Sequence, residues 1–311
     1  MVQSADFGNR IAGYRKRAWR SRYLLLMMLF PLTYLILFCY LPIYGAQIAF
    51  REYNPYKGVW GSEWVGLTHF ITFFKSVFFV RLFRNTLVIS LTQMAFTFPL
   101  PIIVALMLNE IANRYVKQTL QTVLYLPHFI SVVVVAGLIF SVLSPNSGII
   151  NRIIQLTGHE PVYFFNEPKY FPFIIALAEV WQNTGWGTIV YLAAISAIDP
   201  TLYEAAVVDG ASRFRQLLNI TLPAITPTII TLFILRIGGL FTVGYQKILL
   251  LYNPTIYETA DIIQTFVYRR GITGQEFSFG TAVDLFNSVL NLIMLLAFNK
   301  IMKRVSETSL W

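Results

Sequence analysis

Polar and aromatic side chains in the middle of one apolar segment are the clearest candidates for ligand chemistry in this chain. Five occur within eight residues: Glu179, Trp181, Gln182, Asn183 and Trp186. Aromatic rings stack against the apolar faces of sugars, and planar polar groups bond sugar hydroxyls. A charge within a membrane segment is costly, so a functional or paired role is expected. The alternative is that the tryptophans anchor a membrane interface and the polar groups line a helix contact.

Two basic residues, Arg236 and Lys247, lie in the next apolar segment, with the pair Gly238-Gly239 between them. Glycine weakens a helix interior, so this pattern predicts a loosened helix that faces a water-filled cavity. Arg236 is therefore a further candidate on a substrate path. The alternative is that Arg236 pairs with Glu179 or Asp284 and serves packing alone.

The last apolar segment carries a polar stripe of Asp284, Asn287 and Asn291, at positions i, i+3 and i+7. This spacing places the three side chains on one face of a helix. Such a face is expected toward a pore or a second membrane subunit and away from lipid. The two asparagines are also candidates for contacts with sugar hydroxyls.

Residues 199–223, between two apolar segments, have a different character. Asp199-Pro200 predicts an N-cap followed by a first-turn proline, and Gly210 predicts the left-handed residue that ends this helix. A second short helix is expected over 212–220, and Pro223 then falls in the first turn of the next membrane helix. The loop is predicted to be a helix, a sharp bend and a helix along one membrane face.

The residues of this loop suit docking to another protein. The small residues Ala205 and Ala206 allow a partner surface to approach closely, and Glu204 and Asp209 offer charges across an interface. The alternative is an amphipathic helix that lies among lipid head groups. That alternative favours Lys and Arg on the polar face, whereas acidic residues occupy this helix.

Catalysis and metal binding are not indicated. The three histidines, His69, His128 and His159, have no second ligand at metal-binding spacing, and no Ser-His-Asp or carboxylate set is arranged for hydrolysis. The GxxxxGK[ST] phosphate loop is absent from the sequence. Cys39, the single cysteine, is expected to be a small buried hydrophobic residue. The prediction is a protein that is not an enzyme and holds no cofactor or metal of its own.

The composition is that of a membrane protein, with 56% hydrophobic and 13% charged residues, whereas soluble domains carry about a quarter charged residues. Six apolar segments reach the roughly 20 residues that a transmembrane helix needs. A β-barrel is disfavoured because its strands would alternate in hydrophobicity. The predicted fold is all-α, with six transmembrane helices and a cytoplasmic helix-turn-helix loop at 199–223. The six predicted spans are Tyr23–Ala46, Asn85–Asn109, Gln118–Leu143, Tyr170–Ile198, Ala224–Leu250 and Phe277–Asn299.

Basic residues predict the orientation of these spans. With the N-terminus inside, the inside segments hold 13 Lys and Arg, and the longer outside loops hold 9. Both termini are therefore expected in the cytoplasm. The net charge of +9 follows from this placement and does not indicate nucleic-acid binding. The expected organisation is a basic segment 1–22, a membrane domain 23–302 and a tail 303–311.

The loop also resembles a known family. Its spacing of Glu-Ala-Ala, three residues, Gly, nine residues, Ile, one residue and Leu-Pro matches the EAA signature of permeases from binding-protein-dependent ABC importers. The segments YLPHFISVVVVAGLIFS, SPNSGIIN, WQNTGWGTIVYLAAI and AAISAIDPTLYEAAVVDGASRFRQLLNITLPAITPTI are similar to the carbohydrate branch of that family, of the maltose-importer type. The resemblance covers essentially residues 20–305.

This resemblance implies a type I importer in the bacterial cytoplasmic membrane. Two homologous permeases would form the pore, two ATP-binding subunits would bind ATP and Mg, and an extracytoplasmic solute-binding protein would deliver an oligosaccharide. Glu204, Ala205, Ala206, Asp209 and Gly210 would then belong to the segment that docks on an ATPase subunit.

Two rival functions are weighed against this one. An ion-coupled secondary transporter would need acidic groups at the midplane, and Glu179 and Asp284 could fill that role. The EAA spacing would then have no explanation. An intramembrane enzyme lacks a catalytic set.

Overall fold

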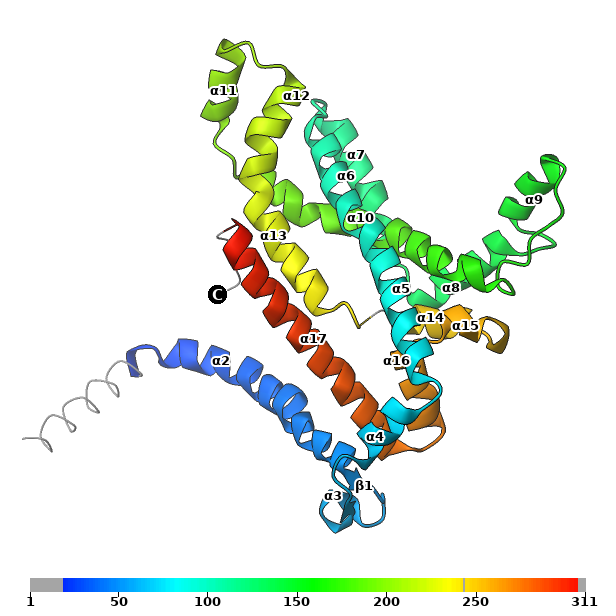
Figure 1. Ribbon diagram of the computed structural model, residues 1–311. Helices are drawn as coiled ribbons and strands as arrows, with labels where there is room; N and C mark the ends of the chain where they lie inside the picture. Colours follow the sequence, from blue (N-terminus) through cyan, green and yellow to red (C-terminus); the bar gives the residue numbers. More distant parts are fainter. Residues whose placement is uncertain (1–18, 243, 307–311) are drawn as a thin grey trace, which may run out of the picture. The chain divides into compact units, whose positions relative to one another are not determined.

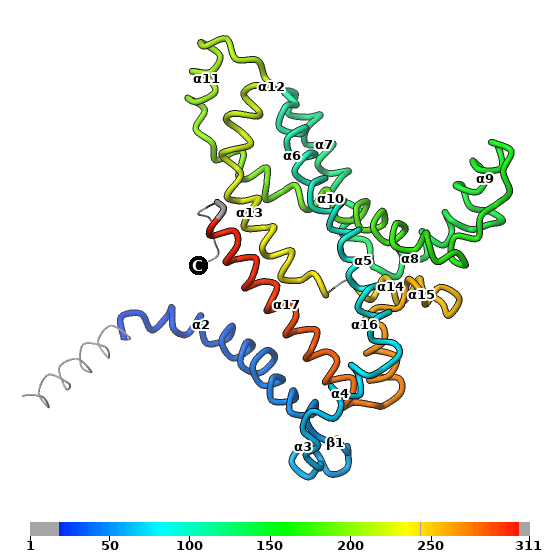
Figure 2. Tube along the Cα trace, viewed as in Figure 1, coloured from blue at the N-terminus to red at the C-terminus, as the bar shows by residue number. Residues whose placement is uncertain are grey.

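The computed structural model describes residues 19–242 and 244–306 (Figures 1 and 2). The described chain is almost entirely helical and forms two compact units, Met1–Thr68 and His69–Trp311. Most of the predicted basic segment 1–22, and the end of the predicted tail 303–311, lie outside the described residues. Each unit is described by itself.

The first unit is dominated by one long apolar helical run. It consists of α2 (Arg22–Leu35), η1 (Ile36–Tyr40) and η2 (Leu41–Phe50), and it is long enough to cross a membrane. The first predicted span is confirmed and extends to Phe50. Cys39 is exposed on this run, so the expectation that it is buried is wrong. A run in which almost every side chain is apolar has no preferred inner face, and sequence does not mark which residues pack.

A small antiparallel pair follows this run. Strand β1 (Arg51–Glu52) pairs with β2 (Glu63–Trp64), and α3 (Gly58–Gly61) lies between them. The guanidinium of Arg51 lies 5.3 Å from the ring centre of Trp64 and 5.5 Å from that of Trp60. These cation–π contacts explain why a loop rich in aromatic residues is ordered.

The second unit holds the other membrane helices, and three of the predicted spans match them closely. After α4 (Thr68–Lys75), the second span is α5 (Phe79–Thr97) with α6 (Pro99–Asn109). The fourth is η4 (Pro168–Tyr170) with α10 (Phe171–Ser196), and the sixth is α17 (Phe277–Ser306). Four helical runs of the described chain are long and apolar enough to span a membrane, and six are reached if each of two bent pairs is one span.

The third span is sharply bent. It consists of α7 (Arg114–Tyr125) with η3 (Leu126–Phe129), followed by α8 (Val132–Leu143) at an angle of 100°. Ser131 caps α8, because its side-chain oxygen accepts a hydrogen bond from the amide of Val134. The predicted segment Gln118–Leu143 contains both arms but gave no sign of the bend.

The fifth span differs from the prediction at both ends. The helix expected over 212–220 is present and begins at the N-cap Ser212, but α12 (Arg213–Gln216), η5 (Leu217–Thr221) and α13 (Leu222–Gly238) form one continuous run, so its separation from the fifth span is wrong. The π-helical turn η5 ends two residues before Pro223, which has no N–H for the usual helical bond. The run ends at Gly238, and α14 (Tyr245–Leu251) is a separate helix; the expected span Ala224–Leu250 is therefore broken.

Short helices complete the unit. α9 (Ile149–Leu156) is the surface helix that ends near Gly158, a residue with φ of +83°. α11 (Pro200–Val208) follows α10, and four short elements precede α17: η6 (Pro254–Ile256), α15 (Tyr257–Ala260), α16 (Ile263–Val267) and η7 (Tyr268–Thr273).

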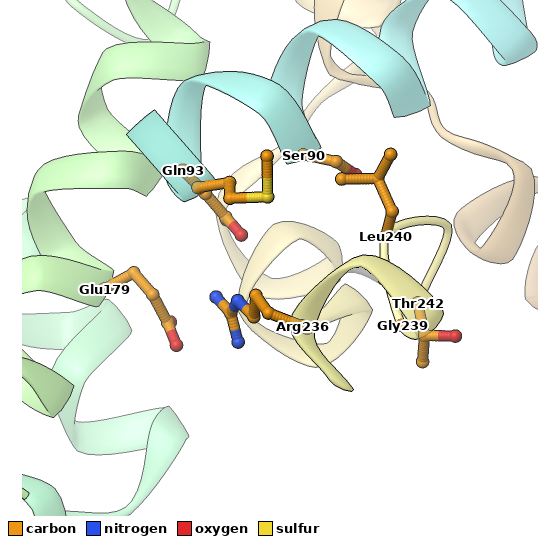
Figure 3. A pocket seen from close by; sticks show the side chains of 9 residues that line it. Ser90, Gln93, Glu179, Arg236, Gly239, Leu240 and Thr242 are labelled. Carbon is orange, nitrogen blue, oxygen red and sulfur yellow. The ribbon is translucent and has the colours of Figure 1, made fainter. Parts of the chain in front are cut away.

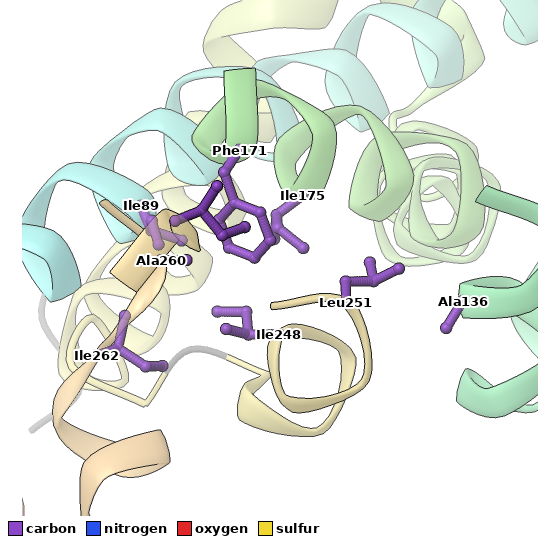
Figure 4. Packing of buried hydrophobic residues seen from close by; sticks show 9 residues of the cluster. Ile89, Ala136, Phe171, Ile175, Ile248, Leu251, Ala260 and Ile262 are labelled. Carbon is purple, nitrogen blue, oxygen red and sulfur yellow. The ribbon is translucent and has the colours of Figure 1, made fainter. Parts of the chain in front are cut away.

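Helix α10 lies at the centre of the second unit. It packs along α5, α6 and α7, and α13 packs against α17 (Figure 1). Ile248 and Leu251 of α14 are fully buried against Phe171 and Ile175 of α10, in the cluster that Figure 4 shows. The broken end of the fifth span is therefore packed into the core, which brings Lys247 next to α10.

Candidate functional site

Residues 199–223, named the coupling loop for the role predicted from their sequence, begin with a capped helix. Asp199 accepts a hydrogen bond of 2.9 Å at Oδ1 from the backbone N–H of Thr201, which makes it the N-cap of α11. The same hydrogen bonding from Thr201 lowers the pKa of Asp199, since it stabilises the carboxylate. α11 turns 69° away from α10. The predicted helix start is confirmed.

Gly210 ends α11 as predicted. Its φ is +73°, the left-handed region that suits glycine, and no atom lies within 4 Å of a Cβ placed there. The amide of Ala211 donates to the carbonyl of Ala206 at 2.8 Å, and that of Gly210 donates to Val207 at 3.0 Å. These are the two bonds of a Schellman ending. The need for glycine here comes from the backbone conformation and not from crowding.

Two side-chain contacts hold the helices of the loop in place. The hydroxyls of Tyr203 and Thr221 are 2.9 Å apart and join α11 to η5. Arg213 forms an ion pair of 3.6 Å with Glu110, which follows α6. In Figure 1, α11 and α12 lie at the same end of this unit as the turn between α6 and α7. The first contact joins two helices of the loop itself, and the second joins the loop to the end of the second span.

The outward side of the loop is apolar and acidic. Glu204, Ala205, Asp209 and Gly210 are exposed, and Ala206 is half-buried. The largest apolar groups beside them are also exposed, Val208 at 87% and Phe214 at 70%. A braced loop with an exposed apolar surface is the kind of element that binds a partner protein. Docking by these five residues stays a prediction.

A second group of candidates lies on one face of α10. Glu179, Asn183 and Trp186, at i, i+4 and i+7, are on the same side of the helix. Glu179 forms an ion pair of 2.8 Å with Lys247, whose side chain is 6% exposed. The amide nitrogen of Asn183 donates to the other oxygen of Glu179 at 2.6 Å. The acid on α10 is thus paired, and its partner is Lys247 instead of the suggested Arg236.

His128 of η3 joins this group. Its Nδ1 lies 2.7 Å from the amide oxygen of Asn183, and its ring stacks on Trp186 with centres 4.5 Å apart and an interplanar angle of 4°. Phe129 meets the edge of the same indole, with ring centres 5.6 Å apart. His128 was not predicted as a site residue, because its proximity to Asn183 depends on the bend of the third span.

A cavity of about 430 Å³ opens beside these side chains. It is lined by Glu179, Asn183 and Trp186 of α10, and by Thr97 and Arg236 from the neighbouring spans, among others. The guanidinium of Arg236 donates to the hydroxyl of Thr97 at 3.2 Å. A smaller adjoining pocket of about 60 Å³ shares Glu179 and Arg236, and Figure 3 shows these two side chains pointing toward each other.

Trp181 and Gln182, which the sequence grouped with Asn183, lie away from the cavity, so this grouping is wrong. Trp181 lines an apolar groove of about 530 Å³ formed with α8 and α9. Gln182 is 8% exposed, and its amide donates to the carbonyl of Ile130 at 2.9 Å, at the bend of the third span. Successive residues of a helix point about 100° apart, so adjacency in sequence separates these side chains from Asn183.

The polar stripe of α17 does not act as one surface. Asn287 is 2% exposed and donates to the carbonyl of Phe241 at 3.1 Å, while the amide oxygen of Asn291 accepts from the N–H of Phe241 at 2.9 Å. Both asparagines therefore hold the chain where the fifth span breaks. Asp284 is exposed and has no hydrogen-bond or ion-pair partner within the part of the chain that the structure describes. Sugar contact by the asparagines stays untested.

Comparison with known proteins defines the class first. Residues 97–307 match the family described as the inner membrane component of binding-protein-dependent transport systems. The match covers more than half of the chain, and it includes both the coupling loop and the cavity. The chain belongs to this family.

The full-length relatives and structures point to the same class. The chain is 42% identical to protein LplB of Bacillus subtilis strain 168, over 94% of this chain and 92% of that protein. It is 43% identical to YteP, a polygalacturonan/rhamnogalacturonan transport system permease of the same organism, over 94% and 91%.

The fold is also similar to a permease in the crystal structure of a bacterial ABC transporter involved in import of the acidic polysaccharide alginate. The TM-score is 0.85 at 42% identity, over 94% of this chain and 98% of that one. A second crystal structure holds an alginate transporter in complex with a periplasmic protein that binds an alginate pentasaccharide, with a TM-score of 0.86 at 41% identity over 95% and 99%. The chain is therefore a multi-pass permease subunit of an ABC importer, of the carbohydrate branch, and the resemblance inferred from the EAA spacing is confirmed.

Proposed function

We propose that this permease conducts acidic oligosaccharides, such as fragments of uronate-containing polysaccharides. The observation that carries the proposal is the cavity beside α10, which combines an indole, an amide and a guanidinium. One acid, Glu179, and two basic groups, Lys247 and Arg236, leave one positive charge in excess there. Relatives named for polygalacturonan and alginate transport support a substrate with carboxylates.

The excess charge belongs to Arg236. Lys247 is buried and paired with Glu179, whereas Arg236 is exposed and makes one recorded bond, to the neutral hydroxyl of Thr97. An exposed guanidinium on a membrane span requires an aqueous surrounding or an anionic partner. Arginine binds carboxylates through two parallel hydrogen bonds, so Arg236 suits a uronate group.

The energy is supplied by other subunits in this proposal. Two ATP-binding subunits hold ATP and Mg, and one of them binds α11 through Glu204, Ala205, Ala206, Asp209 and Gly210. A second homologous permease completes the pore, and a solute-binding protein delivers the sugar from outside. Both termini and the coupling loop lie in the cytoplasm, which the distribution of Lys and Arg supports.

The rival secondary transporter is disfavoured by the pairing of Glu179. A carboxylate that couples ion movement must exchange its ion, whereas this one is held by Lys247 at 2.8 Å and by Asn183 at 2.6 Å. The partner-driven mechanism needs no such exchange.

The proposal is tested by uptake into proteoliposomes that contain the assembled importer. Arg236→Gln should raise the KM for an oligogalacturonide by about 10- to 150-fold, because a charge-assisted hydrogen bond contributes about 1.5–3 kcal/mol. Uptake of a neutral maltooligosaccharide should not fall in this variant. Arg152→Gln, at an exposed position on α9, is the matched control. Equal kinetics of Arg236→Gln and the wild type on the acidic sugar would contradict the proposal.

A further inference from the structure

We propose that His128 is a positioning residue that fixes the indole of Trp186 as a flat platform for a sugar ring in the cavity. The inference rests on the proposed function for its sugar, but not for the contact between the two rings. His128 would act through Trp186 and would not touch the substrate.

The ring contact covers one side of the indole. The two rings are nearly parallel, at 4°, with centres 4.5 Å apart, and Phe129 meets the indole edge at 85°. Trp186 still exposes 44% of its surface and lines the cavity of about 430 Å³. An indole held on one face and at one edge keeps its remaining face for a ligand, at little cost in lost rotamer freedom when the ligand binds.

The proton on His128 follows from its neighbours. The amide nitrogen of Asn183 donates to Glu179, so the amide oxygen is the atom that faces His128. An oxygen cannot donate, and therefore Nδ1 of His128 carries a proton and donates to Asn183. The opposite orientation of the amide would place its oxygen against the carboxylate of Glu179, with two acceptors in contact. The imidazole plane is thus fixed by a directional bond.

The residues behind this bond form a chain across three spans. Lys247 of α14 holds Glu179, Glu179 holds Asn183, and Asn183 holds His128. Lys247 belongs to the buried helix that follows the break of the fifth span, and His128 lies directly before the bend of the third. Two interrupted spans are thus joined through α10, and the chain ends at the indole. The two breaks therefore place side chains from both spans behind Glu179, Asn183 and Trp186, which line the cavity.

The helices also approach closely enough to make this possible. A Cβ on Gly185 would lie 1.9 Å from the backbone oxygen of Leu124, so α10 and α7 touch through backbone at the residue before Trp186. A closely packed crossing at this point leaves His128 little freedom to move away from the indole.

The position of the indole is tested directly by fluorine NMR on the whole importer labelled with 5-fluorotryptophan. The resonance of Trp186 is assigned by its loss in Trp186→Phe. We expect His128→Ala and Asn183→Leu to shift or broaden that resonance and to leave the signals of this chain's other five tryptophans in place. An unchanged Trp186 resonance in His128→Ala overturns the proposal, whatever sugar the importer carries.

The role in transport is tested by uptake kinetics. Trp186→Ala and His128→Ala should each raise the KM for an oligogalacturonide by between about twofold and tenfold, the range expected for one aromatic contact. The double variant should be no worse than Trp186→Ala, because His128 acts through the indole. Multiplied effects in the double variant would overturn the positioning role.

A variant that keeps a flat ring separates stacking from hydrogen bonding. His128→Phe can stack on Trp186 but cannot donate to Asn183. It should restore part of the affinity lost in His128→Ala, and its Trp186 resonance should lie nearer to that of the wild type. A wild-type importer that takes up no acidic sugar would refute the proposed function alone, since the fluorine signals would still report on the contact.

Discussion

The coupling loop and the cavity lie on the same two helices, α10 and the run Arg213–Gly238, but they are stabilised in different ways. The loop depends on local signals, the Asp199 cap and the Gly210 ending, and two outer contacts brace it. The cavity wall depends on contacts between residues 55 to 68 positions apart, such as Asn183 with His128 and Glu179 with Lys247. A loop that is predicted to bind a partner can be specified by residues close together in the chain, whereas a cavity wall needs residues from several spans.

The two regions are also connected. α11 follows the end of α10 that lies beyond Trp186, and α13, which carries Arg236, begins from the same loop. The run Arg213–Gly238 therefore joins the loop to the cavity wall that carries Arg236 through continuous helix, whereas α11 meets α10 at a 69° bend.

The largest expected effect concerns the buried ion pair. Glu179→Gln leaves Lys247 charged and without its partner at 6% exposure, and loss of one member of a buried pair costs about 3–5 kcal/mol. We expect this variant to lose assembled importer, measured as the permease that co-purifies with its ATPase.

The double variant Glu179→Gln/Lys247→Met should recover much of that assembly, since no charge then remains unpaired. Its transport of a neutral sugar should recover with it if Glu179 serves positioning. If the double variant assembles and still transports nothing, Glu179 has a direct role on the path, as one interpretation of the sequence suggested.

The next effect concerns the helix crossing beside the cavity. Gly185→Ala would place a Cβ 1.9 Å from the backbone oxygen of Leu124, and such overpacking costs about 1–3 kcal/mol or more. We expect a lower thermal unfolding temperature in detergent. Gly137→Ala in α8 is the control, because nothing lies within 4 Å of a Cβ at that position. Equal unfolding temperatures for the two variants would show that α10 and α7 are less closely packed.

The smallest effect on stability, and the most selective one on function, is expected at Gly210. Gly210→Val places a β-branched residue at a φ of +73°, at a cost of about 1–2 kcal/mol confined to the loop. ATPase binding and uptake should fall while the permease stays folded. Gly158→Val introduces similar strain, at a φ of +83°, in the turn after α9, outside the coupling loop. It should leave ATPase binding unchanged; equal losses in both variants would remove the special role of the coupling loop.

Features that depend on neighbouring residues could be read from the sequence. The apolar runs predicted the membrane helices, since a bilayer demands about 20 apolar residues whatever lies beside them. Asp199, Pro200 and Gly210 predicted the limits of α11, because caps and endings act within a few residues. The family could also be recognised from the sequence, since the EAA spacing lies within a single loop.

Features that depend on residues far apart in the chain could not be predicted from the sequence. Pattern alone grouped Trp181 and Gln182 with Asn183, although the rotation of the helix points them to a groove and to the carbonyl of Ile130. The pair Gly238-Gly239 predicted a loosened helix, but it did not predict where the segment after the break packs. Only the packing of α14 against α10 brings Lys247 to Glu179.

The sequence by itself thus determined the class of protein, the apolar helices and the limits of α11, because hydrophobicity, caps and turns act over short stretches of chain. The tertiary structure decided which polar groups meet. Where His128, Asn183, Glu179 and Lys247 lie relative to one another follows from two interrupted helices packed on α10. No spacing within one segment encodes that arrangement, since it is set by contacts between spans.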